Sequence, residues 1–233
     1  MHILIINPNT TASMTEAIAA AGRAVAMETT RITALNPLHG PASIQGAGDG
    51  DAALPGLFAL FEQEVSGKGG YDAVVIACFD DTGLENLKRR SPVPVIGIGE
   101  AAFHAAMLVG ARFSVTTTLA VSVPVIEANI ARYGFAARCA RVRASGVPVL
   151  ALDGEKREAA EIIAAEVARA VAEDGCDAIV LGCAGMADLA NDLTWRFGLP
   201  VIDGVAAAVS LCEALHRAGI GNGWARATDC GGL

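Results

Sequence analysis

A chain of 233 residues that is 53% hydrophobic is long enough to fold around its own core, so it needs no disulfide framework. Its formal net charge is −8 and its longest basic run is Lys88-Arg89-Arg90, which excludes the positive surface that nucleic acids require. No apolar run approaches the roughly 18 residues of a membrane span, and the six cysteines form no C-x-x-C pair, so we expect a cytoplasmic protein with reduced thiols.

Short runs rich in Val and Ile alternate with longer Ala-rich stretches along the whole chain. The short runs predict strands, and the stretches with helical spacing of apolar residues predict helices. This alternation is typical of an α/β fold built on parallel sheets. In chain order we expect strand 3–6, helix 14–27, strand 32–35, helix 56–65, strands 73–77 and 95–98, helix 101–109, strand 113–116, helix 124–132, strand 139–142, helix 156–173, strands 178–181 and 201–202, and helix 206–218.

The chain repeats itself at an interval of 105 residues. GYDAVVIAC at 70–78 matches GCDAIVLGC at 175–183, so Cys78 corresponds to Cys183. We therefore expect two pseudo-symmetric, doubly wound lobes, each with a parallel four-stranded sheet, and an active site in the cleft between them. The last helix should cross back, so residues 1–97 and 206–233 form the first lobe and residues 98–205 form the second.

Cys78 and Cys183 each end a strand just before a helix begins, where backbone amides and the helix dipole are expected to lower a thiol pKa. A thiolate on one face of a carbon and a thiol on the other can invert a stereocentre without a metal or any other cofactor. The amides of Phe79, Asp80, Ala184 and Gly185 are candidates to bind the oxygen that gains charge. For either cysteine alone, packing in the core is the competing interpretation.

Neutral polar side chains follow the first strand and its counterpart in the second half, and we expect them to line the same cleft. They also suit turns, caps and strand ends, so a purely structural role is the alternative. The four histidines are scattered without the spacing of metal ligands. The polar candidates are Asn9, Thr10, Thr116, Thr117 and Thr118.

Several longer stretches resemble the aspartate/glutamate/hydantoin racemase superfamily, and within it the hydantoin racemase branch. The stretches are INPNT at 6–10, GPASI at 40–44, CFDDTGL at 78–84, EAAFH at 100–104, RFSVTT at 112–117 and GCAGM at 182–186. The resemblance implies the two-lobed fold, catalytic roles for Cys78 and Cys183, and substrate-binding roles that also include Ser43, Ile44 and Met186.

The implied activity is cofactor-independent racemisation of a small molecule, a 5-substituted hydantoin. The Ala-rich helices and the apolar composition separately lead us to expect a homo-oligomer. Where glutamate-type members carry Asp-Ser-Gly after the first strand, this chain has Asn7-Pro8-Asn9, which suits a neutral ring better than an amino acid. Allantoin racemase is one alternative, and a non-catalytic two-lobed protein that binds a small ligand is another. A dinucleotide site at Gly97-Ile98-Gly99 lacks the acidic residue expected about 20 positions later. The segment 221–233, which carries Cys230, has no assigned role.

Overall fold

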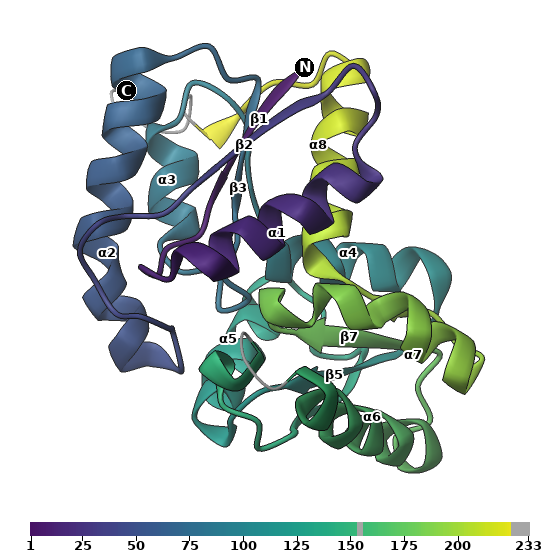
Figure 1. Ribbon diagram of the computed structural model, residues 1–233. Coiled ribbons are helices and arrows are strands. Elements are labelled where there is room, and N and C mark those ends of the chain that lie inside the picture. Colours follow the sequence, from purple (N-terminus) through teal and green to yellow (C-terminus); the bar gives the residue numbers. More distant parts are fainter. Residues whose placement is uncertain (153–155, 225–233) are drawn as a thin grey trace, which may run out of the picture.

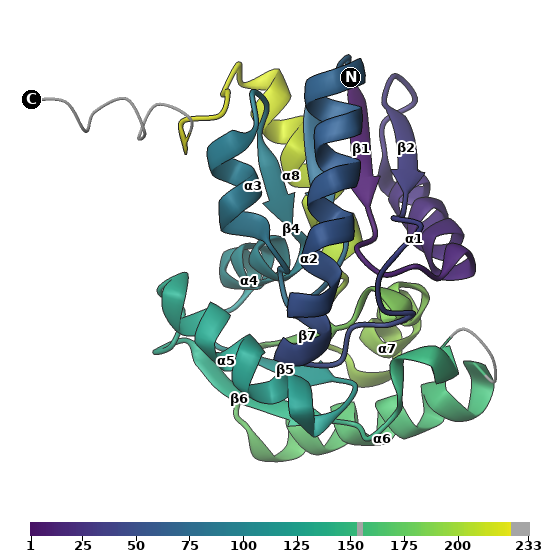
Figure 2. The same ribbon diagram turned by 90° about the vertical axis from the view of Figure 1, so that its left-hand side faces the viewer.

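The two halves of the chain form two four-stranded parallel sheets with equivalent strand orders, β2-β1-β3-β4 and β6-β5-β7-β8. The computed structural model describes residues 1–152 and 156–224. The expected α/β fold, with two doubly wound lobes that each contain a parallel four-stranded sheet, is confirmed (Figures 1 and 2). The strands are β1 His2–Ile6, β2 Arg31–Leu35, β3 Ala73–Ile76, β4 Val95–Gly97, β5 Phe113–Thr117, β6 Cys139–Ala144, β7 Ala178–Gly182 and β8 Val201–Ile202.

The repeated aspartates have the same task in both lobes. The Asp72 carboxylate accepts a hydrogen bond from the amide of His2 over 2.7 Å, where β1 begins. The Asp177 carboxylate accepts hydrogen bonds from the amides of Ala111 and Arg112, just before β5, over 2.8 and 3.0 Å. Each aspartate therefore ties the start of its own strand to the start of the neighbouring one, which sets the register of the pair.

Helices cover both faces of each sheet, and two helices, Ile98–Val109 and Gly204–Arg217, lie between the sheets. A core shared by the two lobes joins Ile5 of β1 to Phe103 of α4, Val115 of β5 and Val205 of α8. Figure 1 shows α8 rising from the second lobe alongside the first sheet, where it packs against α1 and α4. The helices are α1 Ala12–Val25, α2 Ala47–Phe61, α3 Leu84–Arg90, α4 Ile98–Val109, α5 Val123–Arg132, α6 Lys156–Glu173, α7 Ala190–Phe197 and α8 Gly204–Arg217. The lobe boundaries near residues 97 and 205 remain a prediction.

Three helices differ from the expected pattern. Helix α2 begins at Ala47 rather than near residue 56, because the burial of Ala53, Leu57 and Phe61 on one face outweighs the low helix propensity of its glycines. Helices α3 and α7 have 7 and 8 residues, too short for their apolar spacing to stand out. None of the described helices is both long and apolar enough to span a membrane.

Candidate active site

Cys78 and Cys183 reach one cavity from opposite lobes. Cys78 follows β3 after a single residue, Ala77, and Cys183 follows β7 directly. Both line a cavity of about 30 Å³, which we call the thiol cavity. In Figure 2 the labelled strands of the first sheet, β1, β2 and β4, run toward the second lobe. Equivalent strand ends thus deliver two thiols to one small space.

The Cys78 thiol is held in a polar turn and is half-buried at the edge of the thiol cavity. The Thr82 hydroxyl donates a hydrogen bond to Cys78 Sγ over 3.4 Å. Burial raises the pKa of Cys78 well above its usual range, and the charges of Asp80 and Asp81 raise it further. The Thr82 hydroxyl and the Asp80 amide lower this pKa but do not offset the loss of hydration.

Cys183 has a similar environment with a smaller shift. Burial raises the pKa of Cys183 to about 11, while the Gly185 amide lowers it and the Asp80 charge raises it. The expectation that strand-end amides and the helix dipole leave these thiols with lowered pKa values is therefore wrong, because desolvation of the thiolate is the larger effect. Both side chains are thiols at neutral pH, and Cys183 ionises more readily than Cys78.

Asp81 organises the loop that carries Cys78, a role that the sequence did not reveal. Its carboxylate accepts hydrogen bonds from the amides of Gly99 and Glu100 over 3.0 and 2.8 Å, and from the Tyr133 hydroxyl over 2.8 Å. It thereby caps the start of α4 and links the Cys78 loop to Tyr133, the residue that follows α5. Burial raises the pKa of Asp81 to about 7. Its backbone φ of 48° is the one positive value at a non-glycine residue in the described chain.

The Asp81 carboxylate also explains the Gly97-Ile98-Gly99 sequence. A Cβ atom at Gly97 would lie 2.0 Å from Asp81 Oδ1, and one at Gly99 would lie 2.5 Å from the Phe79 carbonyl oxygen. These glycines make room for the Cys78 loop, and the first amides of α4 are already bound to a carboxylate. The amides that a dinucleotide phosphate would use at a helix start are therefore occupied.

The predicted site residues separate into those that line the thiol cavity and those that support it. The predicted residues in the lining are Asn9, Ile44, Phe79, Asp80, Thr118 and Ala184. Lining residues that sequence reasoning did not select include Asn7, Met14, Ile18, Ser122 and Val149. Asn7 could have been found from the INPNT stretch, because its side chain donates to Asn9 Oδ1 over 2.9 Å and orients that amide.

The remaining predicted residues lie outside the lining. Thr10 Oγ1 donates to the Pro41 carbonyl over 3.3 Å, and Thr117 Oγ1 donates to the Gly182 carbonyl over 3.0 Å. Ser43 and Thr116 are buried, and Thr116 Oγ1 has no hydrogen-bond partner among the described residues. Met186 is fully buried in the core of the second lobe. Their roles in substrate binding stay predictions, and for Met186 the position indicates packing.

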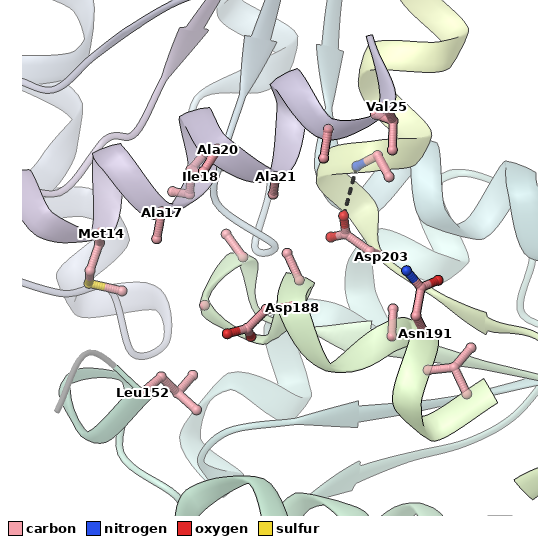
Figure 3. Close-up of a pocket in the computed structure, with 17 residues that line it drawn as sticks. Met14, Ala17, Ile18, Ala20, Ala21, Val25, Leu152, Asp188, Asn191 and Asp203 are labelled. Carbon is pink, nitrogen blue, oxygen red and sulfur yellow. Dashed lines mark hydrogen bonds between the residues drawn. The ribbon is translucent and has the colours of Figure 1, made fainter. Parts of the chain in front are cut away.

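A larger groove adjoins the thiol cavity (Figure 3), and we call it the side groove. Its volume is about 490 Å³, and it shares Met14, Ile18 and Ala184 with the thiol cavity. Figure 3 shows Met14, Ala17 and Ala21 of α1 pointing across it toward the 3₁₀ segment Ala184–Leu189 and the start of α7. Most of its lining is alanine and other apolar residues. Its polar lining side chains are Asp188, Asn191 and Asp203, the last of which caps α8.

No three His, Cys, Asp or Glu side chains come together to hold a metal ion within residues 1–152 and 156–224. The charged groups nearest the thiols are carboxylates rather than cations. Asp80 and Asp81 raise the pKa of Cys78, and Asp80 also raises that of Cys183. The thiol cavity therefore brings together two thiols and one carboxyl group, all of which are groups that can exchange protons.

Comparison with known proteins identifies the family. The family model for Asp/Glu/Hydantoin racemase matches residues 3–212. A hydantoin racemase from Rhizobium meliloti is 48% identical over 219 residues, covering 94% of this chain and 90% of the relative. A hydantoin racemase from Pseudomonas sp. (strain NS671) is 39% identical over 215 residues, covering 92% of this chain and 86% of the relative.

Solved structures agree with this assignment. The structure of an allantoin racemase from Klebsiella pneumoniae superimposes with a TM-score of 0.93 at 42% identity, covering 97% of this chain and 93% of that one. The resemblance suggested by the sequence motifs is thereby confirmed. The chain belongs to the Asp/Glu/hydantoin racemase family and is an isomerase of the racemase type.

Proposed function

We propose that this racemase inverts the C5 stereocentre of 5-substituted hydantoins, with Cys78 and Cys183 as its acid and base and without a cofactor. The observation that carries the proposal is the meeting of two thiols, from equivalent strand ends of two lobes, in one small cavity. A single buried cysteine would be explained by packing alone. Two at matching positions supply one proton-transfer group for each face of a carbon.

In the proposed cycle, one cysteine first loses its proton, and its thiolate then removes the C5 proton. The electron pair of the C–H bond passes into the adjacent carbonyl, which gives a planar enolate. The other cysteine donates its proton to the opposite face of C5 and becomes the thiolate. The substrate is isomerised, and one thiol and one thiolate remain with their roles exchanged. The opposite enantiomer uses the two cysteines in the reverse order.

Backbone amides have two tasks in this cycle. The amides of Asp80 and Gly185 favour the charged forms of Cys78 and Cys183, respectively, and so assist formation of the thiolate. The amides of Phe79 and Ala184, which directly follow the two cysteines, are the donors that we assign to the enolate oxygen. Fixed donors in a water-poor cavity stabilise developing charge more than bulk water does.

The side groove supports the choice of a substrate with a bulky 5-substituent. The thiol cavity is far smaller than the groove, at about 30 Å³ against about 490 Å³, so a large substituent must extend into the groove while the ring lies between the thiols. Met14, Ile18 and Ala184 belong to the linings of both the thiol cavity and the side groove. Apolar walls favour an alkyl or aryl substituent over a polar one.

A variant of α1 tests the placement of the substituent. Ala17→Leu adds bulk to the groove wall at an exposed helical position, so we expect kcat/KM for 5-benzylhydantoin to fall about tenfold while that for 5-methylhydantoin is unchanged. Ala12→Leu is the matched control, because Ala12 is also exposed on α1 but does not line the groove. Equal losses on both substrates would contradict this placement.

Allantoin is the second candidate substrate. The 42% identity to an allantoin racemase and the polar side chains of Asp188 and Asn191 in the side groove favour it. The polar ureido group of allantoin can form hydrogen bonds with a carboxylate and an amide. Comparing kcat/KM for allantoin, 5-benzylhydantoin and 5-methylhydantoin separates the candidates, and a preference of about tenfold or more for allantoin would overturn our first choice.

Single cysteine variants test the chemistry. Each enantiomer of 5-benzylhydantoin is incubated in deuterated water, and optical rotation and C5 deuteration are followed together. We expect Cys78→Ser and Cys183→Ser each to abolish racemisation while retaining exchange on one enantiomer only, and on opposite enantiomers in the two variants. Cys139→Ser is the control, because Cys139 is half-buried on β6 and does not line the cavity.

Two outcomes would overturn the proposal. Racemisation that survives both cysteine replacements would exclude the two-thiol mechanism. A wild-type protein that binds hydantoins in calorimetry but never exchanges C5–H would instead indicate a small-molecule-binding protein without activity on them.

A further inference from the structure

Among the described residues, Asp80 is the one charged residue that lines the thiol cavity. Asp80 lies in the turn after Cys78, and its backbone carbonyl accepts a hydrogen bond from Asn129 Nδ2 over 2.8 Å, which holds the turn against α5. Its charge acts on both thiols, because it raises the pKa of Cys78 and of Cys183. Although it comes from the loop of the first lobe, the carboxyl group therefore lies close to both cysteines.

One oxygen of this carboxyl group has no partner. Asp80 Oδ2 is buried and forms no hydrogen bond with any described residue. No ion pair links Asp80 to a lysine or arginine in the part of the chain that the structure describes. A buried acceptor without a partner is unfavourable, and native proteins rarely retain one without a reason. Because Asp80 lines the reaction cavity, we infer that a substrate in that cavity supplies the missing donor.

We propose that the Asp80 carboxylate accepts a hydrogen bond from the ring N1–H of the substrate. This inference rests on the proposed function and deepens it. In a hydantoin, C5 is bonded to N1 and to the C4 carbonyl, so when the thiols bracket C5 the N1–H is the nearest donor to a neighbouring carboxylate. The Asp80 side chain thus selects for a ring that carries an N–H beside the reacting carbon.

The same hydrogen bond orients the ring for the reaction. A carboxylate next to the enolate oxygen would oppose the charge that develops there. Binding at N1–H places the C4 carbonyl on the other side of C5, away from Asp80 and toward the backbone amides that follow the cysteines. Burial raises the pKa of Asp80 to about 6, so the group is mainly an acceptor at the alkaline pH that favours thiolate formation.

A cycle of one protein change and one substrate change tests the contact. The protein change is Asp80→Ala, and the substrate change is methylation of N1 in 5-benzylhydantoin. For the wild type we expect N1-methylation to lower kcat/KM by about 10- to 100-fold, the range for a hydrogen bond to a charged acceptor. In Asp80→Ala we expect kcat/KM for unmethylated 5-benzylhydantoin to be lower by the same factor. N1-methylation of the substrate should then lower kcat/KM of this variant by less than about threefold.

The controls separate contact from general damage. N3-methylation leaves N1–H in place, so its effect should be the same in wild type and Asp80→Ala. Asp51→Ala removes an exposed carboxylate of α2 outside the thiol cavity and should behave as wild type. If Asp80→Ala does not fold, Asp80→Asn keeps the size of the side chain and a weaker neutral acceptor, and it should reduce the N1-methylation effect without removing it.

The outcomes distinguish this inference from the function on which it rests. If N1-methylation lowers kcat/KM by the same factor in Asp80→Ala, or in Asp80→Asn, as in the wild type, Asp80 does not contact N1–H. That result would refute this inference but not the proposed function. A wild type that racemises no hydantoin would refute the proposed function first, before the cycle is measured.

Discussion

Removal of the Asp81 carboxylate should destabilise the protein strongly. Asp81→Ala deletes three hydrogen bonds, from the Gly99 and Glu100 amides and the Tyr133 hydroxyl, and leaves one buried and two half-buried donors without this acceptor. Hydrogen bonds to a charged group contribute about 1.5 to 3 kcal/mol each, but the three share one acceptor and are not additive. Loss of a helix cap alone costs about 1 kcal/mol. We therefore expect the free energy of unfolding to fall by about 3 to 5 kcal/mol.

The assay is urea unfolding followed by circular dichroism at pH 8, where Asp81, with a pKa of about 7, is mainly ionised. Tyr133→Phe is the control, because it removes only one of the three hydrogen bonds and should cost about 1 kcal/mol. A loss in Asp81→Ala no larger than that in Tyr133→Phe would show that the carboxylate does not hold the Cys78 loop to α4, and the reasoning would fail.

Two further predictions concern Gly97 and the pH dependence of the reaction. Gly97→Ala should destabilise the protein by at least about 2 kcal/mol, because its Cβ would lie 2.0 Å from Asp81 Oδ1. In Gly48→Ala the new Cβ meets no atom within 4 Å, so this helical substitution should stabilise by about 0.5 to 1 kcal/mol, and equal unfolding midpoints would count against the packing argument. Racemisation should become faster as pH rises above neutral, because burial raises the pKa of Cys183 to about 11 and leaves little thiolate at neutral pH. Asp80→Asn removes a negative charge that raises the pKa of both thiols, so the rise of kcat/KM should begin at lower pH, and an unchanged or upward-shifted profile would contradict it.

The sequence alone determined the strands, the duplication and the pair of cysteines. Strands such as β1 and β3 are short apolar runs buried in parallel sheets, a pattern that local hydrophobicity specifies. The repeat of 105 residues predicted that Cys78 and Cys183 occupy equivalent strand ends. Because strand order and crossover direction follow general rules in α/β folds, the common cleft could be expected as well.

Only the tertiary structure decided the electrostatics of the site, the contacts that support it and the shape of the groove beside it. The sign of the thiol pKa shifts depends on burial and on the Asp80 charge, and neither can be read from the residues next to each cysteine. The roles of Asp81 and Gly97 depend on the contact between the loop after β3 and the start of α4. The Gly99 amide that binds Asp81 lies 18 residues after it in the chain. The side groove forms where α1 of one lobe faces the segment after Cys183 in the other. Local sequence specifies elements, whereas burial and contacts between distant segments set the electrostatics and the shape of a site between two lobes.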